Sequence, residues 1–232
     1  MKRITFTIAV LSLFISYIEG QKSVTIVAKG ETTLESALPA DMLYAFEEFT
    51  DARLLMKDGS ENQTRININL VTNDILFLTR GNQILVLAYP DQVERIVMGE
   101  SVWVPVDGTF GERLAEADGK SLVRVRQTRI TDTRKEGGFG FASSTASVTS
   151  MTSYISEGNL VGVPLAVGEY DFETADTYRI VAGKKTFTAD ARGFSKAFGD
   201  RKKEIDNYLR SNQVDFKNEE EVIGFMKRCI EM

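Results

Sequence analysis

The stretch Ile66-Asn67-Ile68-Asn69-Leu70, followed by Ile75-Leu76-Phe77-Leu78 and Ile84-Leu85-Val86-Leu87, decides the fold class. In the first segment aliphatic and amide side chains alternate, which predicts a half-buried strand because successive side chains of a strand point to opposite faces. The other two segments are apolar on both faces and flank Thr79-Arg80-Gly81-Asn82-Gln83. This arrangement predicts a central hairpin that is covered on both sides and contributes to the core.

The same kind of pattern extends outward from these segments. Between Arg53 and Thr131, short apolar segments recur about every eight to twelve residues. They are separated by turn sequences such as Asp58-Gly59, Asp107-Gly108 and Asp118-Gly119. This spacing predicts an antiparallel β meander or sandwich over residues 53–131.

The C-terminal part of the chain changes from strand to helix patterns. Thr177–Val181 and Lys185–Ala189 predict a hairpin, and helices are predicted over Gly193–Phe198, from an Asp200 cap to about Ser211, and after an Asn218 cap. The apolar stripe of the last helix is Val222, Phe225, Met226 and Cys229. We therefore expect a mainly β (α+β) fold, with a β-rich domain over residues 21–189 and a C-terminal helical tail over 190–232 packed on the same fold.

The first twenty residues have the pattern of a signal peptide. Lys2 and Arg3 precede an apolar run from Ile4 to Tyr17. The segment ends in Ile18-Glu19-Gly20, which places a small residue at the expected cleavage site. A membrane anchor is the alternative, but about 15 apolar residues are short against the roughly 20 that span a bilayer. We expect cleavage after Gly20, export to the periplasm, the outer surface or the medium, and no transmembrane span after removal of the signal.

Composition excludes several classes of chemistry. The chain has no His and one Cys, so it cannot build a Ser-His-Asp or Cys-His site, a His-ligated zinc site or a four-cysteine cluster. No cofactor or metal is expected. Without residues 1–20 the chain has 26 basic and 32 acidic residues, a net charge of −6, which argues against nucleic acid as a partner.

Residues 136–162 are rich in Gly, Ser and Thr and predict a long loop or a weakly paired hairpin. Gly137-Gly138-Phe139-Gly140 has the glycines of a phosphate-binding loop. However, no Gly-Lys-Ser or Gly-Lys-Thr follows it, so nucleotide binding is not expected.

Several segments together resemble uncharacterised exported proteins of Gram-negative bacteria. They are Tyr44-Ala45-Phe46-Glu47-Glu48-Phe49, Lys57-Asp58-Gly59, the strands at 66–70 and 74–78, Phe194–Phe198, Lys202-Lys203-Glu204-Ile205 and Asp215-Phe216-Lys217. The resemblance covers most of the chain after residue 20. It implies export and a similar fold, and it implies no activity or catalytic residue.

Two features are candidates for ligand binding. Arg124 and Arg126 project from one face of a predicted strand and, with Arg129, form a cationic stripe that could hold an anionic glycan or lipid head group. The alternative is a solvated strand face that neighbouring acids partly neutralise. Trp103 could be a ligand-stacking platform, or it could pack in the core or at its rim.

The sequence leaves function open between two classes. A non-enzymatic exported binding or envelope-associated protein fits best, with an envelope component or an anionic glycan or lipid as its partner. The alternative is a carboxylate-dependent carbohydrate-active hydrolase using Glu47 with Glu48, or Asp171 with Glu173, which could share one strand face. Neither the oligomeric state nor the ligand follows from these patterns.

Overall fold

The computed structural model describes residues 21–29, 31–136, 142–144, 154–156, 159–161 and 165–232. The strands are β1 Gln21–Ala28, β2 Thr50–Met56, β3 Glu61–Ile68, β4 Ile75–Leu78, β5 Ile84–Val86, β6 Val93–Met98, β7 Ser101–Val106, β8 Thr109–Ala117, β9 Lys120–Glu136, β10 Ala142–Ser144, β11 Tyr154–Ser156, β12 Asn159–Val161, β13 Gly168–Ala182 and β14 Lys185–Thr188. The helices are α1 Leu34–Ala37, α2 Ala40–Leu43, α3 Ala191–Ala197, α4 Lys202–Ser211 and α5 Glu219–Glu231, with 3-10 turns at Pro90–Gln92 and Gly199–Arg201. The predicted signal peptide and most of the predicted loop lie outside the described residues.

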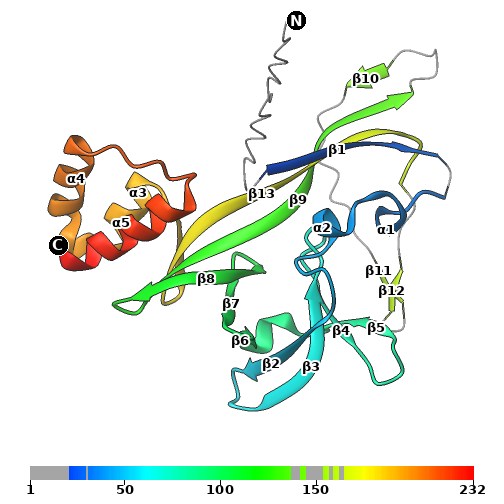
Figure 1. The fold of residues 1–232 in the computed structure, drawn as a ribbon, viewed down its shortest axis with the longest axis horizontal. Coiled ribbons are helices and arrows are strands. Elements are labelled where there is room, and N and C mark those ends of the chain that lie inside the picture. The colour runs from blue at the N-terminus through cyan, green and yellow to red at the C-terminus, as the bar shows by residue number, and fades with distance from the viewer. Residues whose placement is uncertain (1–20, 30, 137–141, 145–153, 157–158, 162–164) are drawn as a thin grey trace, which may run out of the picture.

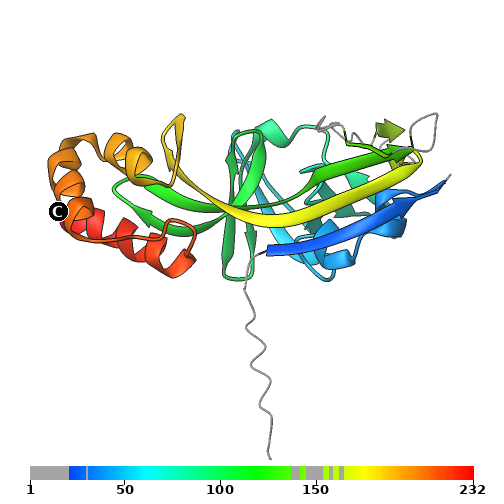
Figure 2. The same cartoon turned by 90° about the horizontal axis from the view of Figure 1, so that it is seen from above.

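These strands form one open antiparallel sheet, as the sequence predicts (Figure 1). Its order is β1-β13-β9-β8-β7-β6-β2-β3-β4-β5-β12-β11, with β10 paired to β9 and β14 paired to β13. The two longest strands, β9 and β13, pair along most of their length and form a spine. Figure 2 shows α3–α5 at one end of this spine, and β1, α1 and α2 toward the other.

The meander turns follow the predicted chemistry. Asp107 and Gly108 have φ of 48° and 81°, and Asp118 and Gly119 have φ of 51° and 68°. Positive φ at both central residues matches the right-handed twist of hairpin strands. These turns therefore join β7 to β8 and β8 to β9 tightly.

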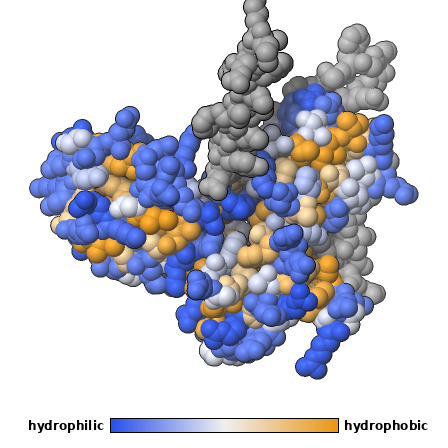
Figure 3. Space-filling model, in the orientation of Figure 1, coloured by the Kyte–Doolittle hydropathy of each residue, from blue (hydrophilic) through white to orange (hydrophobic). Residues whose placement is uncertain are grey.

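Buried apolar side chains gather in three main clusters along the sheet. The first joins the helices to the spine and includes Phe194, Phe225, Leu122 and Ile180. The second fills the meander around Ile66, Ile96 and Trp103, and the third lies between α1, α2, β1 and β13. We call residues 190–232 the helical lobe; in Figure 3, which has the orientation of Figure 1, the end of the molecule that carries α3–α5 lies beside the meander.

Two expectations about the meander are wrong. Asn67 and Asn69, predicted to face solvent, are 2% and 1% exposed. The Asn67 amide donates to the carbonyl of Phe46 and accepts from the N–H of Phe46, which compensates its burial. The Asn69 amide oxygen accepts from the N–H groups of Val71 and Thr72, but its Nδ2 has no partner among the described residues, so burial of Asn69 is compensated only in part.

The β4–β5 hairpin forms where predicted, but it is neither central nor covered on both sides. Ile84 in β5 remains 38% exposed, and β5 pairs with β12 at a single residue pair, Asn159 with Leu85. The apolar run identified the strands but not their place in the sheet.

The helices also form close to their predicted bounds. Asn218 caps α5 by accepting from the N–H of Glu221, and Val222, Phe225, Met226 and Cys229 are buried as one stripe. Asp200, however, does not cap α4, because it lies inside the 3-10 turn that precedes Lys202.

Cys229 packs in the core, and burial raises the pKa of its thiol to about 12, which opposes a nucleophilic role.

Candidate functional site

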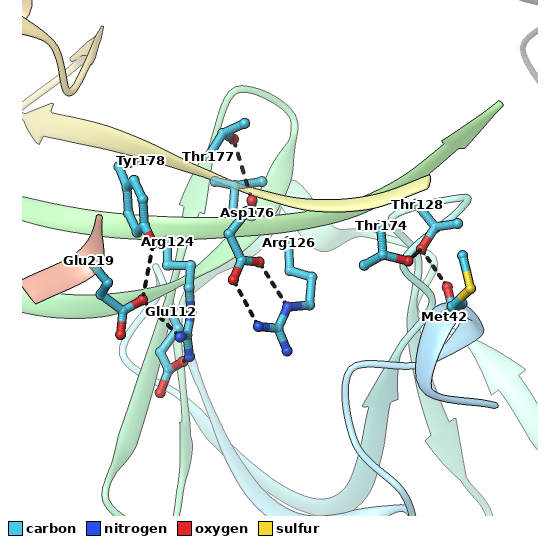
Figure 4. Close-up of polar contacts among 11 residues, drawn as sticks. Met42, Glu112, Arg124, Arg126, Thr128, Thr174, Asp176, Thr177, Tyr178 and Glu219 are labelled. Atoms are coloured by element: carbon cyan, nitrogen blue, oxygen red, sulfur yellow. Dashed lines mark hydrogen bonds and ion pairs between the residues drawn. The ribbon is translucent and has the colours of Figure 1, made fainter. Parts of the chain in front are cut away.

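Arg124 and Arg126 lie on the spine and are held by acidic side chains (Figure 4). Arg126 forms two parallel hydrogen bonds to Asp176, from Nε to Oδ1 and from Nη2 to Oδ2, each 2.8 Å long. Arg124 donates from Nη1 to Glu219 Oε2 at 2.8 Å and from Nη2 to Glu112. We call these five charged residues the spine cluster.

Strand register explains this arrangement. Arg124 lies opposite Glu112 on β8, and Arg126 lies opposite Asp176 on β13. Cross-strand partners share one face of a sheet, so each guanidinium meets a carboxylate from a neighbouring strand. Glu219 reaches the same place from the first turn of α5. The cluster thus links the helical lobe to the sheet.

Tyr178 completes the spine cluster on the helix side. It lies opposite Arg124 in the β9–β13 register, and its hydroxyl donates to Glu219 Oε2 at 3.4 Å. Burial, followed by the charge of Glu219, raises the pKa of Tyr178 to about 12. The phenol therefore remains a neutral donor over the physiological pH range.

The predicted cationic stripe is divided in the structure. Arg124 and Arg126 share one face of β9, whereas Arg129 is on the opposite face, exposed, and donates to Gln127. With three acids around Arg124 and Arg126, little positive charge is left for an anion. Anion binding by this stripe stays a prediction, and the geometry fits a structural role for its first two members.

Trp103 lies in the meander core, where it is 7% exposed and packs edge-on against Phe46 with 5.6 Å between ring centroids. In this position the indole face is covered by protein side chains. Of the two interpretations of Trp103, the structure therefore favours core packing over a stacking platform.

Among the candidate carboxylates, Asp171 is held by a hydroxyl and a guanidinium. Asp171 accepts from Thr25 Oγ1 at 2.6 Å and from Arg134 Nη2 at 2.9 Å, and these contacts, the Thr25 hydrogen bond first, lower its pKa. A general acid needs a raised pKa, so this environment suits an ion pair instead. Glu47 and Glu48 are exposed on the connection between α2 and β2.

Thr128 and Thr174 form a buried hydroxyl pair at the middle of the spine. Their Oγ1 atoms lie 2.6 Å apart, and Thr128 also donates to the carbonyl of Met42 (Figure 4). The Thr128 N–H donates to the carbonyl of Leu70 at 2.9 Å. These bonds anchor α2 and the end of β3 to the spine, and they leave the two hydroxyls satisfied.

An open cleft on the outer face of β2, β3 and β6 is a better candidate for ligand binding. Its volume is about 610 Å³, within the range of small-ligand sites. Its lining residues are Asp51, Ala52, Arg53, Gln63, Thr64, Arg65, Val97 and Gly99. Since Ala52 and Leu54 are buried while Asp51 and Arg53 are exposed, the cleft is on the side of β2 that faces away from the meander core.

The two arginines of this cleft are less neutralised than those of the spine. Arg65 donates from Nε and Nη2 to the carbonyl oxygen of Phe49 at 3.1 and 2.8 Å, and a neutral acceptor leaves the positive charge in place. Arg53 Nη1 is 3.7 Å from Glu61 Oε1, and both side chains are largely exposed, so this pair is weak. Asp51 is the one acid in the lining.

The sequence alone does not indicate this cleft, because Arg53 and Arg65 belong to different strands and to no motif. The Asp58-Gly59 turn predicts that the flanking strands pair, but it does not fix their register. The structure centres the pairing on Asp58, with Arg53 opposite Gln63 and Asp51 opposite Arg65, whereas pairing centred between Asp58 and Gly59 would put Arg65 opposite Ala52. Both guanidinium groups then belong to one exposed sheet face.

Comparison of the chain with protein families, with curated proteins and with solved structures finds no match. Within the described ranges, no cluster of acidic or cysteine side chains is arranged to hold a metal ion. The longest of the described helices, α5, has 13 residues, and none of them has the length and apolar character to cross a membrane.

Proposed function

We propose that this protein is a non-enzymatic exported binding protein, associated with the cell envelope, and that it binds an anionic envelope component in the cleft over β2, β3 and β6. The observation that carries the proposal is the pair Arg53 and Arg65, two exposed guanidinium groups in one open cleft beside the amide of Gln63. Guanidinium groups form paired hydrogen bonds to phosphate, sulfate and carboxylate oxygens. Gln63, on the same face, adds an amide that suits the hydroxyls of a glycan.

The contrast with the spine cluster supports this choice of site. Arg124 and Arg126 are already bound to carboxylates at 2.8 Å, so an anion would have to displace those partners. In the cleft, one guanidinium contacts a carbonyl and the other an exposed acid at 3.7 Å. An anion that binds in the cleft therefore has to break weaker contacts than one that binds to the spine cluster.

The hydrolase alternative has less support from the same contacts. Asp171 is held ionised by Thr25 and Arg134, and a carboxylate with a lowered pKa does not donate a proton to a leaving group at neutral pH. Glu47 and Glu48 are both exposed, and neither lines the cleft.

Substitution of both cleft arginines tests the proposal. Each arginine near an anionic surface contributes about 1 kcal/mol, so Arg53→Gln with Arg65→Gln should weaken binding about 30-fold. Two probes separate the ligand sources: a sulfated polysaccharide, and vesicles containing phosphatidylglycerol compared with phosphatidylcholine alone. Wild-type binding should also weaken as salt rises, because screening lengths are about 8 Å at physiological ionic strength.

The matched control is Arg210→Gln with Arg228→Gln, which removes two exposed charges from the helical lobe. This variant has the same net charge as the cleft variant and should bind as the wild type does. Equal loss in both variants would mean that only net charge matters, and undiminished binding by the cleft variant would refute the cleft as the site.

A further inference from the structure

Strand β1 ends the sheet, and its one hydrogen-bonded neighbour among the described strands is β13. The two strands pair from Gln21 opposite Ala175 to Ala28 opposite Gly168, without a register shift. Such a strand presents a row of N–H and C=O groups along its outer edge, which is a template for another strand.

This edge lacks the usual protection against pairing. Natural edge strands are blunted by charged side chains, proline or bulges, yet residues 23–28 contain no charge, no proline and no glycine. Lys22 lies at one end of the strand and forms an ion pair with Asp41. On the outer face of β1, Val27 is 59% exposed, and Val167, just before β13, is 57% exposed. An uncharged edge with exposed valines favours association.

We propose that β1 pairs antiparallel with β1 of a second copy of this chain, so that the sheets of two copies join across a twofold axis at Thr25. The argument for a second copy is self-complementarity. Antiparallel twofold pairing keeps side chains on their own face of the sheet, so only residues separated by an even number can lie opposite each other.

The register with Thr25 opposite its counterpart satisfies this rule and keeps charges apart. It places Ser23 opposite Val27, Val24 opposite Ile26 and Lys22 opposite Ala28 of the other copy. No like charges then face each other, and exposed Val27 gains a neighbour on the outer face. The cleft of β2, β3 and β6 belongs to other strands of the sheet, so this association goes beyond the proposed binding function and does not depend on it.

Charge placed on the edge tests the interface without disturbing the protomer. Ser23 and Val27 lie opposite Glu173 and Glu169 of β13 in the same chain, so Ser23→Lys with Val27→Lys suits the folded protomer. Across the proposed interface, each new lysine faces another lysine. We expect the wild type to be a dimer by light scattering coupled to gel filtration, and the lysine variant to dissociate at least 100-fold more readily.

Two controls make this test decisive. Ser23→Gln with Val27→Gln adds polar side chains without charge and should remain dimeric, while circular dichroism should show an unchanged fold in both variants. A monomeric wild type at submillimolar concentration, or a lysine variant that stays dimeric, would overturn the proposal.

Cysteine cross-linking tests the register separately. Thr25→Cys places two thiols directly opposite each other, at a Cα separation of about 4.5–5.5 Å, within disulfide range. Val27→Cys places them four residue steps apart, about 13 Å along the strand. The native Cys229 is buried, so it should not interfere. Oxidation should cross-link the Thr25 variant alone, and cross-linking of the Val27 variant alone would refute this register.

Discussion

Replacing Phe194 by alanine should lower the free energy of unfolding by about 3–5 kcal/mol, the range found for deletion of a buried aromatic ring. Phe194 is fully buried in the cluster that joins α3–α5 to the spine. Its ring packs edge-on against Phe225 at 4.8 Å between centroids and lies 6.0 Å from Phe216. Loss of the ring therefore leaves a cavity where several aromatic groups meet.

Urea unfolding followed by circular dichroism measures this effect. Ile84→Ala is the matched control, because Ile84 is 38% exposed and its truncation should cost about 1 kcal/mol or less. Similar midpoints for the two variants would show that the helical lobe does not depend on this cluster.

Replacing Arg124 by glutamine should lower the free energy of unfolding by about 2–3 kcal/mol, because it removes charge-assisted hydrogen bonds and leaves two carboxylates without their cation. The side chain of Arg124 is 25% exposed, and those of Glu112 and Glu219 are 20% and 33% exposed, so solvent screens this site only in part. The loss should appear in stability and not in anion binding, since the spine cluster is neutralised.

A double-mutant cycle separates this interaction from a general effect of charge. Adding Glu219→Gln to Arg124→Gln removes one of the stranded carboxylates and should recover about 1 kcal/mol. Arg228→Gln, which breaks an exposed pair with Glu231, should change stability by at most about 0.5 kcal/mol. Additive effects of Arg124→Gln and Glu219→Gln would contradict a coupled cluster.

Local sequence patterns predicted much of the fold, because side-chain alternation, turn residues and helix caps depend on residues that are close together in the sequence. Apolar periodicity and turn residues predicted an antiparallel sheet over residues 53–131, where the structure has most of β2–β9, and an asparagine cap with an apolar stripe predicted α5. What they could not supply was the environment of each strand. Alternation alone predicts that Asn67 and Asn69 face solvent, but backbone groups of Phe46 and Val71 bond to these side chains in the interior.

The candidate site was less predictable because it depends on pairing between distant segments. The arginines at 124 and 126 were found from β9 alone, but their acidic partners come from β8, β13 and α5, so the sequence could not show that their charge is neutralised. The cleft arginines, Arg53 and Arg65, meet only once the β2–β3 register is known. A charge pattern on one strand therefore says little about the charge that a ligand would meet.

Mapping an anionic ligand by amide chemical shifts tests the central claim most directly. Titration of the isotope-labelled protein with a sulfated oligosaccharide should shift the amide resonances of Arg53, Arg65 and Gly99, which line the cleft, and leave those of Arg124 and Arg126 in place. Shifts that centre on residues 124–129, or no shifts at concentrations where the wild-type protein is retained by the polysaccharide, would contradict the assignment of binding to the cleft.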